Sequence, residues 1–401
     1  MTNSGALSKR IKRHVIGRVQ EFFAATSPGL ENICLKELHG APLSVANASI
    51  SRGGVTFAGR LPDCYQANLH LRTANRVLMR IESFKATNFR RLDKKLTDFP
   101  WELYLPAGVT LLIHATAHHS RLFHKKAIVR HVRDSIPLEM LSVEETGGLQ
   151  SPRSSGIQQI FVRVQDDRFT LSIDSSGELL HKRGLKFASG RAPLRETIAA
   201  AALIRAGYTG REILIDPLCG SGTFSLEGAM RALNIPAGQF RNFAFFDWPC
   251  FRQPQWAFIK RQAQASSMKI RKPIIFASDK DPAVCRALKR HVSKSGFSEV
   301  IRVEQKDFTD LSTKRIMRQA DSAEPGIIAL NPPYGRRLGT FKESQQLFDE
   351  IFEKLKSDFR GWKLALIVPD KKIAQKIPFK VKSLPLFHGG LRLSLLFGRI
   401  Y

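Results

Sequence analysis

The sequence predicts two structural parts, an α+β N-terminal half followed by an α/β domain built around a parallel sheet. Two observations support this. Up to about residue 175, short strand-like and helix-like stretches mix without regular order, whereas after Gly190 apolar strand-like runs alternate with helical segments. The alternation is typical of βαβ units, in which helices cover both faces of a parallel sheet. We expect the boundary near residues 176–190, and a length of 401 residues fits two or three domains.

The N-terminal half is interpreted from side-chain periodicity. Strands are expected where apolar and polar side chains alternate or β-formers cluster, at 54–57, 109–116, 159–164 and 169–173. Residues 67–81 carry apolar side chains at helical spacing, namely Leu71, Ala74, Leu78 and Ile81, which predicts a helix. Segment 144–158 is rich in Gly, Pro and Ser and is predicted as a surface loop.

The second half supplies the predicted parallel sheet. Its apolar runs are expected as strands at 213–215, 274–277, 301–303, 327–330 and 364–368. The segments that separate them are expected as helices, at 195–206, 224–232, 282–295 and 345–359. A final alternating stretch, 389–398, predicts a last antiparallel strand.

The net charge of +28 narrows the choice of partners. Because the positive excess is spread along both halves, it favours a long polyanion such as nucleic acid, and an anionic membrane surface is the weaker alternative. No apolar run is long enough to span a membrane, and the first 20 residues are a basic stretch without the apolar core of a secretion signal. The five cysteines form no metal-ligand pattern. We therefore expect a cytoplasmic protein without a metal site.

The strongest local motif follows the first strand of the second half and reads Asp-Pro-Leu-Cys-Gly-Ser-Gly-Thr. A parallel sheet binds its ligand at the carboxyl ends of its strands, where glycines let the backbone approach the ligand. The motif differs from the dinucleotide and phosphate-loop patterns, and on its own it also fits a tight connection. Its candidate ligand-binding residues are Asp216, Cys219, Gly220, Gly222 and Thr223, with Asp216 placed to hold an ammonium group.

Acidic residues follow the next two strands. Asp279 ends the strand at 274–277 and is the candidate for binding ribose hydroxyls. Asp281 precedes Pro282, where a helix N-cap is expected, so we predict a structural role for it. Asp307 and Phe308 follow the strand at 301–303, in position to reach the amino group and ring of an adenine, although a loop acid fits Asp307 as well.

The decisive motif is Asn331-Pro332-Pro333-Tyr334, directly after the strand at 327–330. An exocyclic base amine is a poor nucleophile, because its lone pair is delocalised into the ring. The Asn331 side-chain oxygen and the Pro332 carbonyl can accept both amine hydrogens while Tyr334 stacks on the base. The two prolines hold this backbone stiffly, so catalysis depends on positioning the nitrogen against a sulfonium donor. The competing interpretation is a Pro-Pro turn that only ends a strand.

At these residues the chain resembles the class I amino-methyltransferases with an Asn-Pro-Pro-Tyr motif, and more narrowly the THUMP-domain guanine-N2 RNA methyltransferases. The narrower resemblance rests on 22–38, 53–57, 71–78, 171–177, 181–184 and 192–197. It implies a Rossmann-like class I methyltransferase domain over 176–401. Before it, the resemblance implies a basic tail over 1–20, a ferredoxin-like domain over 21–80 and a THUMP RNA-binding domain over 81–175.

The resemblance also implies a function. Its cofactor is S-adenosyl-L-methionine, its partner is 23S ribosomal RNA or a large-subunit precursor, and its product is N2-methylguanosine. If the target guanine lies in a helix, it must be flipped out of its stack to reach Tyr334. A tRNA guanine-N2 enzyme, a DNA adenine-N6 methyltransferase and a noncatalytic RNA-binding assembly factor stay open, as does the oligomeric state. One catalytic domain implies a single activity. Candidate RNA contacts are Arg121, Lys125, Lys126 and Arg183, the last able to serve domain docking instead.

Overall fold

The computed structural model describes residues 3–141, 156–185, 194–333, 341–369 and 371–401. The chain forms two compact units, each with its own seven-stranded sheet. The first unit comprises Met1–Thr26, Cys34–Leu180 and Arg241–Arg261, and the second comprises Ser27–Ile33, His181–Phe240 and Gln262–Tyr401. The main division between the units lies between Leu180 and His181, and 241–261 belongs to the first unit.

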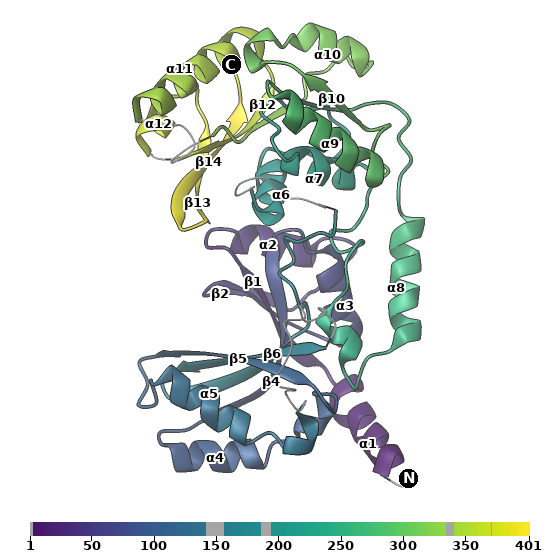
Figure 1. Ribbon diagram of the computed structural model, residues 1–401, viewed down its shortest axis with the longest axis vertical. Helices are drawn as coiled ribbons and strands as arrows, with labels where there is room; N and C mark the ends of the chain where they lie inside the picture. The colour runs from purple at the N-terminus through teal and green to yellow at the C-terminus, as the bar shows by residue number, and fades with distance from the viewer. Residues whose placement is uncertain (1–2, 142–155, 186–193, 334–340, 370) are drawn as a thin grey trace. The chain divides into compact units, whose positions relative to one another are not determined.

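The first sheet has the strand order β2-β3-β1-β4-β7-β6-β5 (Figure 1). Neighbouring strands are antiparallel except β5 and β6, which are parallel. The strands predicted in this half are confirmed. Their bounds are β1 Gln20–Thr26, β2 Ala48–Ser51, β3 Gly54–Gly59, β4 Ala74–Lys85, β5 Thr110–His118, β6 Ile157–Gln165 and β7 Arg168–Asp174.

The helix predicted over 67–81 is wrong. Helix α3 (Leu61–His70) ends before this stretch is half complete, and most of the remainder belongs to β4. β4 lies inside the sheet between β1 and β7, so apolar side chains are buried on both of its faces, with Met79 on one and Leu78 on the other. Apolar residues on both faces produce a spacing that matches a helix by coincidence.

Aromatic packing explains why 241–261 belongs to the first unit. The Tyr65 ring of α3 stacks on Phe245 at 4.5 Å between centroids, and Trp256 packs against both rings edge-on. The Gln158 side chain on β6 accepts a hydrogen bond from the Trp248 indole at 3.0 Å. Each contact joins residues far apart in the sequence, so local periodicity carries no sign of them.

Helices and short turns complete the first unit. The predicted basic tail contains helix α1 (Asn3–Ile11) and the π-turn η1 (Lys12–Ile16), and Val15 is fully buried. The other elements are α4 Phe89–Thr97, η2 Trp101–Leu103, α5 Lys125–Asp134, η3 Leu138–Met140 and η4 Ala244–Asp247. Two further helices, α2 Glu31–His39 and α8 Gln253–Ala265, cross the division between the units.

The second sheet has the order β10-β9-β8-β11-β12-β14-β13. The strands β10, β9, β8, β11 and β12, neighbours in this order, are parallel to one another. Strand β14 is antiparallel to β12 and β13, as the sequence predicted for the final strand. The chain moves outward from β8 to β10 and then returns to β11 on the other side of β8, which makes a topological switch point. The bounds are β8 Leu214–Asp216, β9 Ile275–Asp279, β10 Ile301–Gln305, β11 Ile327–Leu330, β12 Lys363–Val368, β13 Lys382–His388 and β14 Leu391–Arg399.

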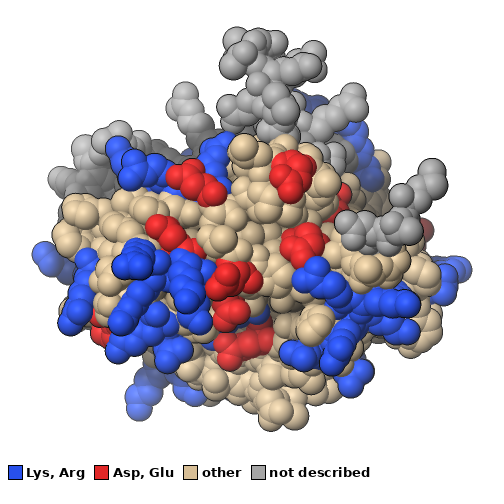
Figure 2. Space-filling view, turned by 90° about the horizontal axis from the view of Figure 1, so that it is seen from below, with Lys and Arg blue, Asp and Glu red and all other residues tan. Residues whose placement is uncertain are grey.

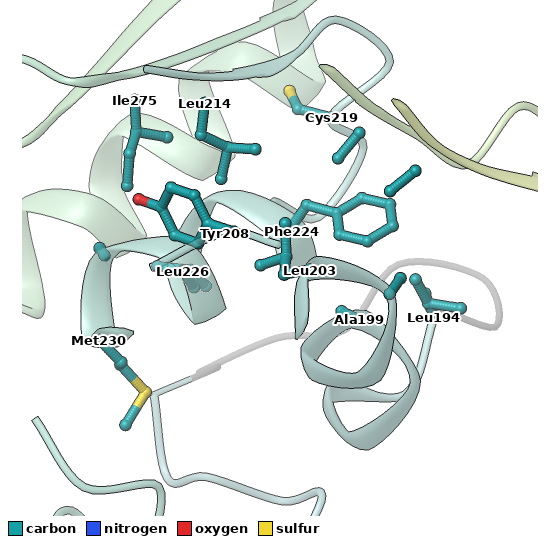
Figure 3. Close-up of a cluster of buried hydrophobic side chains, with 14 of the residues drawn as sticks. Leu194, Ala199, Leu203, Tyr208, Leu214, Cys219, Phe224, Leu226, Met230 and Ile275 are labelled. Atoms are coloured by element: carbon teal, nitrogen blue, oxygen red, sulfur yellow. The ribbon is translucent and has the colours of Figure 1, made fainter. Parts of the chain in front are cut away.

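Helices cover both faces of the second sheet. Helices α6 (Glu196–Arg205), α7 (Thr223–Ala232) and α9 (Pro282–Lys294) share a core with Leu214 and Ile275 (Figure 3). Helices α10 (Thr313–Gln319), α11 (Phe341–Asp358) and α12 (Lys371–Gln375) pack on the opposite face against Ile215 and Phe276. Strands covered on both faces have continuous apolar sequences, which is why the second half was predictable.

Two further features are absent from the described residues. None of their helices combines the length and the apolar character needed to cross a membrane. Within the same residues, no group of His, Cys, Asp or Glu side chains is arranged to hold a metal ion.

Candidate active site

A cleft of about 540 Å³ lies at the carboxyl ends of β8, β9, β10 and β11 in the second unit. This is the switch-point end of the sheet, where α/β folds bind ligands, and the volume is typical of a small-molecule site. The cleft is lined by most of the candidate residues from the sequence, namely Asp216, Cys219, Gly220, Thr223, Asp279, Asp307, Phe308, Asn331 and Pro333.

Gly220 presents its backbone to the cleft. Its φ of +49° lies in the left-handed region, and a Cβ added there would meet no protein atom within 4 Å. Its N–H donates a hydrogen bond to Asp279 Oδ2 at 3.1 Å, which ties the loop after β8 to the end of β9. A ligand can therefore approach the main chain at Gly220 without meeting a side chain.

The structure assigns Gly222 a packing role in place of the predicted ligand contact. Gly222 has a φ of +75° at the N-cap of α7 and is absent from the described residues that line the cleft. A Cβ there would lie 2.2 Å from Leu288 Cδ1 on α9. The missing side chain thus lets α7 and α9 pack closely, which is one of the purposes glycines serve in such turns.

Asp216, the last residue of β8, and Cys219, in the loop that follows, are both buried. Asp216 is 1% exposed, and its Oδ2 accepts hydrogen bonds from the N–H and hydroxyl of Ser225 at 3.1 and 2.7 Å. A carboxylate near a helix N-terminus is favourable, so Asp216 stabilises the first turn of α7 as well as lining the cleft. Burial, with a smaller effect from Asp216 and Asp279, raises the pKa of the Cys219 thiol, which is therefore uncharged and a poor nucleophile.

The two acids after β9 have the separate positions expected. Asp281 is the N-cap of α9, and its Oδ1 accepts a hydrogen bond from the Ala283 N–H at 2.7 Å. Asp279 lines the cleft, and its Oδ1 accepts a hydrogen bond from the Asp281 N–H at 3.1 Å. The Asp279 carboxylate is thus held in one orientation by backbone donors on two segments.

Asp307 and Phe308 follow β10 and also line the cleft. Asp307 Oδ1 accepts hydrogen bonds from the N–H and hydroxyl of Thr309 at 2.9 and 2.8 Å, and these bonds lower the pKa of Asp307. The loop-acid and the ligand-facing interpretations of Asp307 therefore both apply. Phe308 is 6% exposed and packs against Phe359, which fixes its ring.

Asn331 directly follows β11, which is paired with β8 and β12. Its Oδ1 is buried and accepts no hydrogen bond within the described part of the chain. Pro333 lines the cleft, whereas Pro332 is buried and is not among the described lining residues. Tyr334 lies outside the described residues. Since buried acceptors are almost always paired, the unpaired Asn331 oxygen indicates a position for a donor from a ligand.

Arg183 occupies a position that does not suit RNA contact. Its side chain is 2% exposed and forms an ion pair with the equally buried Glu227 on α7, with Nε and Oε1 2.8 Å apart. The prediction of an RNA contact is therefore corrected to its alternative, a structural role. The guanidinium is held inside the second unit.

The other predicted RNA contacts are at the surface of the first unit. Arg121, Lys125 and Lys126 are exposed, and the side chain of Arg121 is 75% accessible. Helix α4 packs beside α5 through stacking of Phe89 on His131. The exposed basic residues of the α4–α5 pair and the loop before α5 are Arg90, Arg91, Lys94, Lys95, Arg121, Lys125, Lys126, Arg130 and Arg133.

Three titratable lining residues were missed by sequence reasoning. Lys280 follows Asp279 at the end of β9, so its position after a parallel strand was the available signal. His291 on α9 and Glu350 on α11 also line the cleft, but they lie within helices. Nothing local distinguishes them from ordinary helix-surface residues.

Two known protein families match parts of this chain. The family described as RMKL-like, methyltransferase domain, matches residues 183–385, which contain the whole cleft. The chain belongs to this RMKL-like methyltransferase family. The RlmL ferredoxin-like domain matches residues 21–78. The Rossmann-like methyltransferase fold and the ferredoxin-like N-terminal domain predicted from the sequence are thereby confirmed.

Curated relatives of this RMKL-like protein are found in several bacteria. A Synechocystis protein, provisionally named an RNA methyltransferase, is 32% identical over 95% of this chain and 97% of its own length. The ribosomal RNA large subunit methyltransferase K/L of Methylococcus capsulatus is also 32% identical, over 94% of this chain and 50% of its own length. The chain thus spans about half the length of the relatives named K/L.

Solved structures resemble the RMKL-like chain along nearly its whole length. One is a provisionally named methyltransferase in complex with S-adenosylhomocysteine, with a TM-score of 0.82, 25% identity and coverage of 96% of this chain and 99% of that one. Another is a protein of Listeria monocytogenes named a predicted N6-adenine-specific DNA methylase, with a TM-score of 0.82, 27% identity and coverage of 96% and 97%.

Proposed function

We propose that this RMKL-like methyltransferase forms N2-methylguanosine in RNA and that its substrate is large-subunit ribosomal RNA. The cofactor is S-adenosylmethionine, since the family is one of methyltransferase domains and a similar structure holds S-adenosylhomocysteine. When bound, the cofactor supplies a methyl group on a positively charged sulfur.

The cleft has the chemistry that a nucleoside cofactor requires. Asp279 is an oriented carboxylate acceptor at the end of β9, where ribose hydroxyls bind in such folds. The Phe308 ring and the apolar side chains of Leu218 and Ile351 form walls for a flat base. The open side of Gly220 leaves the main chain accessible. We infer that these residues hold the cofactor and that Asp216, which is committed to α7, acts mainly by fixing the loop.

The single observation that carries the proposal is the buried Asn331 oxygen beside this cleft, which has no hydrogen-bond partner among the residues that the structure describes. An amine hydrogen bound to this oxygen would satisfy it and would orient the nitrogen lone pair. The Pro332 carbonyl is proposed as the second acceptor and Tyr334 as the stacking partner. Positioning of the nucleophile and electrostatic preorganisation then supply the acceleration without a covalent intermediate.

RNA is proposed as the substrate because of the positive net charge of the chain and the names of its relatives. The chain carries a net charge of +28, which favours a polyanion. Figure 2 views the molecule from below the orientation of Figure 1, and Lys and Arg side chains gather there in patches on either side of a band of Asp and Glu side chains. Relatives bear the names of RNA and ribosomal RNA methyltransferases. We infer that the first unit, with a THUMP domain over 81–175, binds RNA in the cytoplasm.

DNA adenine-N6 methylation is the second candidate. An Asn-Pro-Pro-Tyr loop serves an adenine amine by the same geometry, and the name of the Listeria structure points to that substrate. The match of 21–78 to the ferredoxin-like domain of RlmL favours RNA. A tRNA guanine has identical chemistry at the cleft. A noncatalytic assembly factor is disfavoured, because it would have no use for the unpaired Asn331 oxygen.

Nucleoside analysis separates these candidates. Ribosomal RNA, tRNA and DNA from cells with and without the gene are digested, and methylated nucleosides are quantified by mass spectrometry. The proposal predicts loss of N2-methylguanosine from large-subunit RNA alone. Loss from tRNA, or loss of N6-methyladenine from DNA, selects one of the alternatives. No change in any nucleic acid would contradict enzymatic methylation.

A further inference from the structure

We propose that one face of the sheet in the first unit is a platform on which bases of single-stranded RNA stack. This inference rests on the proposed RNA substrate and adds a second RNA-binding site, separate from the cleft. The alternation of side chains defines the face. Phe22, Met79 and Ile160 are completely buried on the opposite side of β1, β4 and β6. Their sequence neighbours Phe23, Arg80 and Phe161 therefore point to the other side.

We call this other side the open face. Strand register brings its residues together, because Phe23 is paired with Leu78, and Phe161 lies between Ser172 on β7 and His114 on β5. Its centre is a hollow of about 880 Å³, lined chiefly by Phe23, Arg80, His114, Phe161, Arg163 and Arg168. Alternate residues of β5, from Thr110 to His118, are exposed along the edge strand.

The two phenylalanines of the open face already accept planar partners. The Arg80 guanidinium lies over the Phe23 ring at 5.4 Å from its centroid, and the Arg76 guanidinium lies over Phe161 at 5.1 Å. The His114 ring stacks on Phe161 with centroids 4.7 Å apart and an angle of 21° between the planes. An open sheet face that combines aromatic rings with arginines is the arrangement on which unpaired bases stack.

The charge of the open face selects an anionic partner. Arg76 is paired with Asp174, and Arg80 with Glu21, whereas in the described part of the chain Arg163 and Arg168 form no ion pair. Lys85 lies opposite Arg168 at the end of the β4–β7 pair. Asp166 is the acidic residue among the described lining of the hollow. The unpaired cations give the face a positive excess suited to phosphates.

A single strand suits this face better than a duplex. Bases in a helix stack on one another, so they are exposed to a protein ring only in loops, bulges or ends. The α4–α5 pair and the loop before α5 present mainly cations, with the exposed ring of Phe123 among them, and this composition suits chiefly a phosphate backbone. We therefore assign unpaired bases of the RNA substrate to the open face and phosphates of its backbone to the basic helices.

The test measures binding of a fluorescein-labelled single-stranded RNA of about a dozen nucleotides to the full chain by fluorescence anisotropy. The Phe23→Leu, Phe161→Leu double variant should bind it roughly ten to a hundred times more weakly, because base–aromatic stacking is lost. The matched control is Phe258→Leu, which removes a 52% exposed ring on α8, outside the open face, and should leave affinity unchanged. A double variant that binds as tightly as the parent overturns the proposal.

A second variant and a crosslinking experiment test the platform independently, in case the phenylalanine double variant misfolds. Arg163→Gln with Arg168→Gln should weaken binding and reduce the slope of log affinity against log salt by about 1.4, the value for two phosphates on a single strand. A 4-thiouridine oligonucleotide crosslinked to the unmodified protein should attach to peptides from β1, β5 or β6. Crosslinks confined to α4 and α5, or equal binding of the oligonucleotide and its duplex, contradict the platform.

Failure of the platform and failure of the proposed function are distinguishable. Methyl transfer from S-adenosylmethionine to ribosomal RNA by the unmodified protein tests the function without reference to the open face. If transfer occurs and the phenylalanine variants bind the oligonucleotide normally, only the platform is refuted. If the oligonucleotide binds as expected and no RNA is methylated, the platform stands and the proposed function falls. Preferential competition by poly-glutamate would instead identify an acidic protein as the partner.

Discussion

Asp279 Oδ2 accepts a hydrogen bond from the Gly220 N–H at 3.1 Å, which joins the ends of two neighbouring strands across the cleft. The bond connects a glycine whose outer side is open with a carboxylate that has a second backbone donor, the Asp281 N–H. Two loops that follow different strands are thereby held as one surface before any ligand arrives. Preorganisation of this kind reduces the free-energy cost of ordering a site upon binding.

Asp279→Ala should weaken cofactor binding by about ten- to a hundredfold, the value of one or two charge-assisted hydrogen bonds. Isothermal titration calorimetry with S-adenosylhomocysteine measures this change. Asp281→Ala is the matched control two residues away. It removes the N-cap of α9 and should cost about 1 kcal/mol of unfolding free energy while affinity stays the same. Equal affinities for the parent and the Asp279 variant would remove Asp279 from the site.

The two glycines of the loop after β8 should respond differently to alanine. Gly222→Ala combines a left-handed φ with a Cβ 2.2 Å from Leu288 Cδ1, so unfolding free energy should fall by about 2–4 kcal/mol. Gly220→Ala has a strained φ but open space, so it should cost about 1 kcal/mol and mainly reduce cofactor affinity. Chemical denaturation and calorimetry compare them. A larger stability loss at Gly220 than at Gly222 would contradict this assignment.

Glu227→Ala should lower the unfolding free energy by about 3–5 kcal/mol, because it leaves the Arg183 guanidinium buried without its carboxylate. Replacing both residues, as Arg183→Met with Glu227→Leu, should recover most of that loss, since an apolar pair of similar size needs no charge partner. RNA affinity of the double variant should equal that of the parent. A selective loss of RNA binding in this folded variant would restore Arg183 as an RNA contact.

His70 predicts a pH dependence of stability. Burial, with a smaller contribution from the Arg72 charge, lowers the pKa of His70 to about 4 from an ordinary 6.5. Since the fold favours the neutral ring, this contribution is fully present above pH 6.5 and is lost as pH falls toward 4. We expect a loss of about 2 kcal/mol, reduced from the full shift because the ring is partly exposed. Urea denaturation at pH 7, 5.5 and 4 should show a shallower decline for His70→Gln. If the unfolding free energies of the parent and the variant fall equally with pH, groups other than His70 cause the acid sensitivity.

The features predictable from the sequence share one physical basis. A parallel strand covered on both faces is a continuous apolar run, and the polar residue that follows it reaches the ligand edge of the sheet. This pattern located β11 and Asn331, and β9 with Asp279. The N-cap position of Asp281 followed from capping chemistry. These properties are local, so one sequence is enough to find them.

The features that were missed depend on long-range contacts. Gly222 resembles a ligand-binding glycine until Leu288, in another helix, is seen to fill the space beside it. Arg183 looks like a surface cation until Glu227 is found buried against it. The aromatic residues of 243–251 gave no sign that they pack with Tyr65. Identity and spacing cannot reveal a partner that lies tens of residues away.

The central claim is that the Asn331 oxygen holds the amine that becomes methylated. The direct measurement uses ribosomal RNA from cells that lack the gene, S-adenosylmethionine, and purified parent and Asn331→Ala proteins, with N2-methylguanosine quantified under single-turnover conditions. We expect rapid formation by the parent, a loss of roughly a hundredfold or more in the variant, and equal cofactor affinity for both. A variant that forms N2-methylguanosine as fast as the parent would contradict it.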